Sequence, residues 1–252
     1  LVVGWRIYLG RNRIVFVIPS HRTDGILPEY VHYDNIINSF SVGKKWLETL
    51  DMKYVTSINK TISSGKIKGF IKSCELVIDM NISKVASEIT SNRNIKFVLI
   101  SGPSGSGKTT TTKRLSSYLI AQGFDPICIS VDDFFKEREE YPKDKNGNIV
   151  YDSFDTVDLE LFLTTIRDLL GNKEVQLPTF NFNTGKKEYN NKPIKLKDNS
   201  IILIEGLYTL NDELLPFVDN KHKYKIYLSP FIPLNIDRHN YISTIDLRLV
   251  RR

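Results

Sequence analysis

The chain has 252 residues, of which 41% are hydrophobic and 25% are charged, and its formal net charge is +6. This composition is typical of a globular protein and excludes a long low-complexity tract. The mild basic charge suits a polyanionic substrate, such as a nucleotide, as well as it suits nucleic acid. No apolar run approaches the roughly 20 residues that span a bilayer, and the first residues lack the features of a signal peptide, so we expect a cytoplasmic protein.

The first part of the chain is predicted to be a small α+β module. Apolar runs at 5–9 and 14–18 flank a short polar turn, which is typical of a β-hairpin. Three stretches then carry apolar residues at helical spacing, at 36–50, 55–62 and 67–89. The polar run at 91–94 is the expected joint, so we predict an N-terminal domain at 1–92 and a second domain at 93–252.

Predicted strands and helices alternate from Ile95 to the end of the chain. Short apolar runs predict strands at 95–101, 126–131, 201–205 and 224–228, and an extended segment at 175–180. Between them, the apolar residues at 115–119 and at 162–170 follow helical spacing and predict two helices. Alternation of this kind predicts an α/β fold with a parallel sheet and helices on both faces, and ligands bind at the carboxyl ends of the strands in such folds.

The most informative motif lies between the first of these strands and the helix that follows it. Residues 102–109 read Gly-Pro-Ser-Gly-Ser-Gly-Lys-Thr and fit the phosphate-binding pattern G-x-x-x-x-G-K-[ST]. In this pattern backbone N–H groups cradle phosphates, Lys108 reaches the β- and γ-phosphates, and the Thr109 hydroxyl binds Mg²⁺. The predicted nucleotide-binding residues are Gly102, Ser104, Gly105, Ser106, Gly107, Lys108, Thr109 and Thr110.

Acidic residues follow two of the predicted strands. Glu205 ends the strand Ile-Ile-Leu-Ile-Glu, the place of a carboxylate that holds Mg²⁺ directly or through water. Asp132 follows the strand that ends near Val131 and is our candidate to accept the proton of an acceptor hydroxyl and to contact the metal. Spacing alone hardly separates Asp132 from Asp133, one of which is expected to be a turn residue.

Further candidates lie later in the chain. Asp155 and Asp158 precede a helix and are explained by capping, which leaves Asp152 available to bind a substrate. Phe180 and Phe182 alternate along an extended segment and can either stack on a base or belong to the core. The basic residues Arg248, Arg251 and Arg252 suit either the clamping of phosphates or a solvated helix end.

Together these motifs resemble the uridine kinase/phosphoribulokinase family of P-loop kinases over 95–252. The matching segments, in the order of that family, are 102–109, Ser-Val-Asp-Asp-Phe-Phe at 130–135, Tyr-Asp-Ser-Phe-Asp at 151–155, Pro-Thr-Phe-Asn-Phe at 178–182, Ile-Glu-Gly-Leu at 204–207 and Arg-Leu-Val-Arg-Arg at 248–252. The resemblance implies transfer of the γ-phosphate of ATP, with Mg²⁺, to the 5′-hydroxyl of uridine, cytidine or a related nucleoside.

The resemblance also implies roles for individual residues. Asp132 takes the position of the catalytic aspartate, and Lys108 and the terminal arginines are expected to take part in the transfer. Thr109 and Glu205 take the metal positions, with Asp132 nearby. Asp152 takes the position that holds the ribose. Phe180 and Phe182 take positions that line the base pocket. The arginine-bearing lid opens with Arg248, Arg251 and Arg252.

Three departures from the family pattern affect the acceptor side. The segment 183–186 replaces the one in which authentic uridine kinases place a base-reading histidine, and Gly185 has no side chain for that role. Phe180 stands where they carry a tyrosine, which removes a hydroxyl and some power to discriminate a base. The lid has barely begun at Arg252, so we expect a chain truncated at the lid.

The N-terminal part has a separate resemblance. Residues 30–90 are similar to the threonyl-tRNA-synthetase-like region that precedes a uridine-kinase-like domain in one branch of the family, but they lack the paired-histidine metal motif, so no editing activity is implied. Two other functions stay open, a kinase for a different metabolite alcohol and a nucleotide-dependent RNA-binding or regulatory protein. Nucleic-acid binding by this module and homo-oligomer formation also stay open, whereas a membrane partner is not expected.

Overall fold

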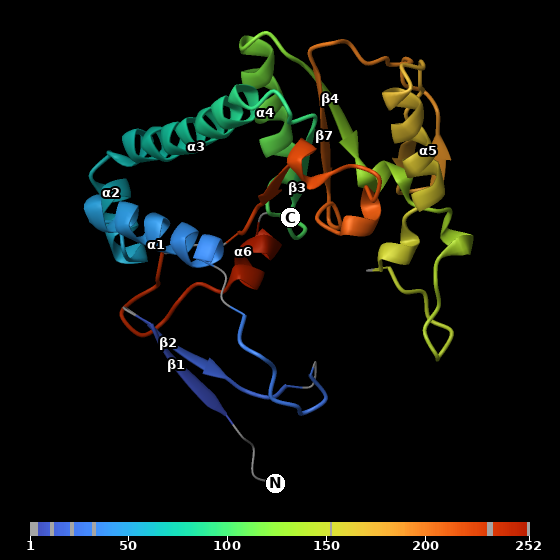
Figure 1. Cartoon of the computed structure of the whole chain (residues 1–252). Helices are drawn as coiled ribbons and strands as arrows, with labels where there is room; N and C mark the ends of the chain where they lie inside the picture. Colours follow the sequence, from blue (N-terminus) through green and yellow to red (C-terminus); the bar gives the residue numbers. More distant parts are fainter. Residues whose placement is uncertain are drawn as a thin grey trace. The chain divides into compact units, whose positions relative to one another are not determined.

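The computed structural model of the chain describes residues 5–10, 13–20, 23–31, 34–151, 153–230 and 234–250. The chain divides into two compact units, Leu1–Lys53 and Tyr54–Arg252, which are coloured from blue to red along the sequence in Figure 1. No helix in the described part of the chain combines the length and the hydrophobicity needed to cross a membrane.

The first unit contains the predicted hairpin and one helix. Strands β1 (Arg6–Gly10) and β2 (Arg13–Val17) pair antiparallel, with Leu9 opposite Ile14, which confirms the hairpin; its two connecting residues lie outside the described ranges. The ring of Tyr8 lies 4.6 Å from that of Tyr30, measured between centroids. Helix α1 (Asp34–Thr49) completes the unit.

The second unit begins with two helices that the sequence assigned to the N-terminal domain. They are α2 (Val55–Ser63) and α3 (Ile67–Ser91). On α3, Ile82, Ala86 and Ile89 follow the spacing of one helical face and are buried. They share a core with Leu115 and Leu119 of α4 (Lys108–Ala121). The division after Lys53 therefore differs from the predicted boundary at 92/93, because the apolar face of α3 packs on α4.

A four-stranded parallel sheet in the order β4-β7-β3-β8 forms the centre of this unit. Its strands are β3 (Phe97–Ser101), β4 (Asp125–Ser130), β7 (Ser200–Gly206) and β8 (Lys223–Tyr227). The predicted parallel sheet is confirmed. In its register Ser101 pairs with Gly206, and Ser130 pairs with Glu205. The carboxyl ends of the three strands therefore meet at one edge, as the sequence predicted.

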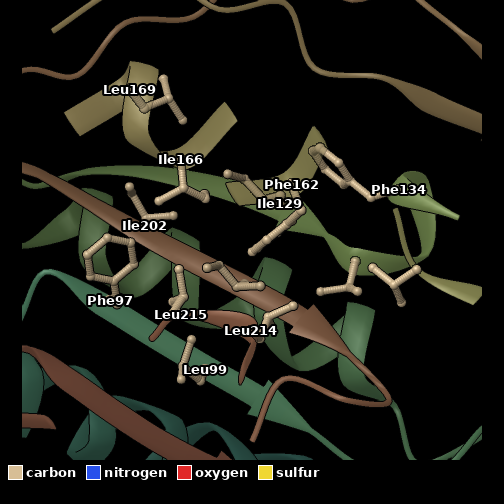
Figure 2. Close-up of a cluster of buried hydrophobic side chains, with 13 residues drawn as sticks. Phe97, Leu99, Ile129, Phe134, Phe162, Ile166, Leu169, Ile202, Leu214 and Leu215 are labelled. Atoms are coloured by element: carbon tan, nitrogen blue, oxygen red, sulfur yellow. The ribbon is translucent and has the colours of Figure 1, made fainter. Parts of the chain in front are cut away.

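Apolar cores lie on both faces of the sheet. Helix α5 (Leu159–Leu170) covers one face, and its Phe162, Ile166 and Leu169 pack toward the strands, as Figure 2 shows. The N-cap of α5 is Asp158, whose carboxylate accepts a hydrogen bond from the backbone N–H of Leu161 at 3.1 Å. Helices α3 and α4 cover the other face. Strand β7 is covered on both faces, so all of its residues are buried and the residues in the middle of the strand are apolar.

Short elements fill the loops at the carboxyl edge. The 3₁₀ turns η2 (Val131–Phe134) and η3 (Arg138–Glu140) follow β4, and β5 (Thr179–Asn181) pairs antiparallel with β6 (Lys186–Glu188). The extended segment predicted at 175–180 is thus only partly a strand. The remaining elements are η4 (Phe154–Thr156), η5 (Asp212–Leu214), η6 (Asn220–His222) and helix α6 (Thr244–Val250).

Candidate functional site

The loop between β3 and α4 has the backbone shape of an anion cradle. Gly105 and Gly107 have φ angles of +77° and +92°, a region that L side chains rarely adopt. Gly102 is crowded instead, because a Cβ added there would lie 2.6 Å from the carbonyl oxygen of Leu228. The loop leads directly into α4, whose first N–H groups have no partner within the helix. Such a helix N-terminus binds phosphate or another anion well.

Oxygen atoms suited to a divalent cation gather beside this loop. The Thr109 hydroxyl donates a hydrogen bond to Oε1 of Glu205 at 2.7 Å, although the two residues are far apart in the sequence. Glu205 is only 6% exposed. The buried hydroxyl of Ser106 has no hydrogen-bond partner among the described residues. A hydroxyl and a buried carboxylate in contact, beside an orphaned hydroxyl in the loop, are the donor type that Mg²⁺ prefers.

Asp132 and Asp133 have different surroundings. Asp132 lines a pocket together with Lys108. Burial raises the pKa of Asp132, the charges of Glu205 and Asp133 raise it further, and Lys108 opposes them. Asp133 instead accepts a hydrogen bond from the backbone N–H of Phe180 at 3.1 Å and so holds β5 in place. The two neighbouring aspartates therefore differ in what they contact: Asp133 binds the backbone of β5, and Asp132 faces the pocket.

The pocket beside Asp132 has a volume of about 280 Å³ and mostly aromatic walls. Phe135 contacts the rings of Phe180 and Phe182, with centroids 5.8 and 6.4 Å away and edge-to-face geometry. Phe180 is 4% exposed, whereas Phe182 is 55% exposed. The two phenylalanines singled out in the sequence therefore line the same cavity as Lys108 and Asp132, and Phe180 also belongs to the buried interior.

Several lining residues were missed by sequence reasoning. They are Phe135, Arg138, Tyr141, Tyr151, Leu207 and Tyr208. Phe135, Tyr151 and Leu207 lie inside the motif segments quoted above, and their position next to candidate residues was the signal available. Arg138 begins the short 3₁₀ turn η3 and Tyr141 directly follows it, in a segment whose sequence carries no periodicity.

The terminal helix touches the phosphate-binding loop. Nε of Arg248 donates a hydrogen bond to the carbonyl oxygen of Ser104 at 2.7 Å. A Cβ added at Gly105 would lie 3.6 Å from the carbonyl oxygen of Arg248, which is ordinary van der Waals contact. Of the other predicted site residues, Asp152, Arg251 and Arg252 lie outside the described residues.

Comparison with known proteins agrees with the motifs. The family model "Phosphoribulokinase / Uridine kinase family" matches residues 97–239. Uridine-cytidine kinase C of Dictyostelium discoideum is 32% identical over 51% of this chain and 26% of its own length. Uridine kinase of Chlamydia pneumoniae is 31% identical over 48% of this chain and 53% of its own length.

A solved structure is also similar. The protein of Bacillus stearothermophilus described as a possible uridine kinase is 28% identical, with a TM-score of 0.43, over 53% of this chain and 70% of that one. The chain thus spans about half, or less, of the length of the two curated relatives. The match to the family model does not extend to residues 30–90, whose likeness to a synthetase stays a prediction. Because the family model covers more than half of the sequence, the chain belongs to the phosphoribulokinase/uridine kinase family.

Proposed function

We propose that the chain transfers the γ-phosphate of ATP to a hydroxyl group of a small molecule, namely the 5′-hydroxyl of uridine, cytidine or a related nucleoside. The observation that carries the proposal is the shared pocket, in which Lys108 of the phosphate-binding loop, Asp132 and an aromatic wall face one cavity. Phosphoryl transfer needs a phosphate cradle, a cation and a group that orients the acceptor hydroxyl. The names of the two curated relatives support a nucleoside acceptor.

The donor end of the site is built by the loop and the start of α4. We assign phosphate binding to the backbone N–H groups of the loop, because the positive φ angles at Gly105 and Gly107 are typical of an anion-binding turn. Lys108 contributes positive charge at the cavity, where it would stabilise the charge that develops on the transferring group. Ser104, Ser106 and Thr110 belong to the same proposed set.

Thr109, Glu205 and Asp132 are the residues that would hold Mg²⁺. The charge of Glu205 raises the pKa of Asp132, so two carboxylates with unfavourable mutual repulsion stand beside the phosphate-binding loop. A divalent cation held there would offset the repulsion between the two carboxylates and would supply positive charge for the phosphates. The side chains of Thr109, Glu205 and Asp132 therefore fit a bound Mg²⁺ ion.

At the acceptor end, Asp132 is proposed to accept the proton of the attacking hydroxyl. A raised pKa improves an aspartate as a proton acceptor, since an ordinary aspartate is a weak base at neutral pH. Phe180 and Phe182 would pack on the base, and Asp152 would hold the ribose. Arg248, with Arg251 and Arg252, would bring guanidinium groups to the phosphates and exclude water.

The decisive test is phosphate transfer from labelled ATP to a panel of nucleosides and sugar alcohols, with and without Mg²⁺. We expect Mg²⁺-dependent transfer to uridine or cytidine. Asp132→Asn should lower kcat by about 10²–10⁴-fold through loss of the base. Asp133→Asn is the matched control, because an amide oxygen can still accept the hydrogen bond from Phe180. Absence of transfer to every acceptor, or equal activity of the Asp132 variant, would overturn the proposal.

A further inference from the structure

The side chain of Arg138 fills the space that a side chain at position 185 would need. A Cβ added at Gly185 would lie 2.7 Å from Cδ and 2.8 Å from Cγ of Arg138, and the φ angle of Gly185 is +71°. The backbone N–H of Arg138 donates to the carbonyl oxygen of Gly185 at 3.4 Å. The guanidinium also donates to the carbonyl oxygen of Phe182. Arg138 is therefore held against the turn between β5 and β6, at the wall of the cavity.

The three phenylalanines near Arg138 are suited to a flat ring but offer it no polar contacts, whereas Tyr141, Tyr151 and Tyr208 carry the hydroxyl groups of the same cavity. Phe135 lies at the centre of these side chains, and its centroid is 6.4 Å from that of Tyr141. Phe180 and Phe182 contact each other edge to face, with centroids 5.1 Å apart. Phenylalanine rings provide apolar area and no conventional hydrogen bond, so they cannot distinguish one flat ring from another by its polar edge.

We propose that Arg138 is a specificity-determining residue, which recognises the acceptor by donating hydrogen bonds to a carbonyl oxygen on its ring. This inference rests on the proposed function. A guanidinium carries five N–H donors in a fixed fork, so the bond to Phe182 leaves donors for a ligand. Asp132, the aromatic side chains and Arg138 line one cavity, so an acceptor with its reacting hydroxyl at Asp132 and its ring among the aromatic side chains would bring the edge of that ring to Arg138. Uridine and cytidine share a ring carbonyl, so both fit.

An anionic acceptor is a poorer match to the same wall. Among the described residues that line the cavity, the cations are Arg138 and Lys108, and Lys108 belongs to the phosphate-binding loop. The charges of Arg138 and Asp132 both act on Tyr141. Burial raises the pKa of Tyr141, the charge of Arg138 lowers it and the charge of Asp132 raises it. Arg138 thus already shares the cavity with the negative charge of Asp132, and a neutral carbonyl oxygen adds no further repulsion.

The test compares two ligands on the full chain and on the Arg138→Met variant. Methionine keeps an apolar stem and removes the donors. The ligands are uridine and a phenyl riboside, which has the same sugar but no ring carbonyl. For uridine we expect the Kd and KM to rise roughly tenfold, the range of a hydrogen bond to a charged group, with little change in kcat. Binding of the phenyl riboside should not change.

Two further variants separate recognition from folding. Gly185→Ala should weaken uridine binding in the same way, because the added Cβ displaces the Arg138 side chain without removing it. Arg93→Met removes an exposed arginine that does not line the cavity and should leave both ligands unaffected.

Each outcome decides the inference. Equal losses of affinity for uridine and the phenyl riboside would show a merely structural role for Arg138 and overturn the inference. Unchanged uridine binding by the variant, or absence of uridine binding by the unaltered chain, would also overturn it. So would tighter Arg138-dependent binding of an anion such as ribose 5-phosphate. Uridine binding that depends on Arg138 but leads to no phosphate transfer would support the inference while the proposed function fails.

Discussion

The surroundings of the Asp132 carboxylate disfavour its negative charge. It is partly buried, and the charges of Glu205 and Asp133 act on it in the same direction, against Lys108 alone. The folded protein therefore holds a proton on Asp132 at a pH where the unfolded chain has released it. An arrangement that costs folding free energy at neutral pH is typical of a residue kept for chemistry rather than for stability.

This arrangement gives a prediction for Asp132→Asn without metal or nucleotide. A raised carboxyl pKa means that the protein loses stability as the pH rises from the ordinary aspartate value, near 3.8, through the raised value. Asparagine carries no charge, so the variant should melt a few degrees higher than the unaltered chain near pH 7.5, with a smaller difference near pH 4. Calorimetric scans at both pH values would measure this.

The control for that prediction is Asp212, whose pKa is lowered by a hydrogen bond and an ion pair with Lys225. The charged form of Asp212 favours the folded protein, whereas the charged form of Asp132 disfavours it. Asp212→Asn should therefore give no gain in melting temperature near pH 7.5. A lower melting temperature for Asp132→Asn than for the unaltered chain would contradict the assignment of a destabilising charge.

Among the elements, the loop from Gly102 to Thr109 and the helix α3 use glycine for different reasons. Gly102 lies where a Cβ would meet the carbonyl oxygen of Leu228 at 2.6 Å and the hydroxyl of Ser106 at 2.7 Å. Gly69 lies within α3 with nothing within 4 Å of an added Cβ. The first glycine is required by a close approach, and the second only weakens a helix.

An alanine at Gly102 should therefore harm ATP binding, whereas an alanine at Gly69 should stabilise the protein. Gly102→Ala must shift the loop, so we expect at least a tenfold loss of ATP affinity, since a cradle of N–H groups depends on their exact directions. Gly69→Ala should raise the free energy of unfolding by about 0.5–1 kcal/mol and leave ATP binding unchanged. Titration with ATP and urea denaturation would measure the two effects. Unchanged ATP affinity of Gly102→Ala would show that the loop does not form the cradle.

Much of the architecture could be predicted from the sequence because its signals are local. Apolar runs and helical stripes gave the parallel sheet and its helices, and the position of Asp132 after a strand gave its place at the carboxyl edge. The contact of Arg138 with Phe182 joins residues 44 positions apart and follows no pattern. The absence of a side chain at Gly185 could be read in the sequence, but the group that fills the space could not.

At the scale of the whole molecule, the position of α3 explains why the domain boundary was hard to predict. Its apolar stripe has the same spacing whichever neighbour it packs against. In the structure the stripe covers Leu115 and Leu119, and Arg114 of α4 forms an ion pair with Asp79 of α3 at 3.3 Å. The helix is thus part of the support for the phosphate-binding loop.

Two truncated chains would test this assignment. A chain that begins at Tyr54 keeps α3, whereas one that begins at Arg93 exposes the α4 face covered by Ile82 and Ile89. Burial of two isoleucine side chains contributes about 3–6 kcal/mol, so the shorter chain should unfold at much lower urea concentration. Equal stability of the two would show that α3 is dispensable for the second unit.

The packing of Arg138 over Gly185 has a consequence for how this family can diversify. The two positions compete for one volume, so a bulky residue at 185 is compatible only with a short or displaced residue at 138. In related chains the two positions should then change together rather than independently. Acceptor preference would shift through paired substitutions in two separate loops, with the strands and the phosphate-binding loop left intact.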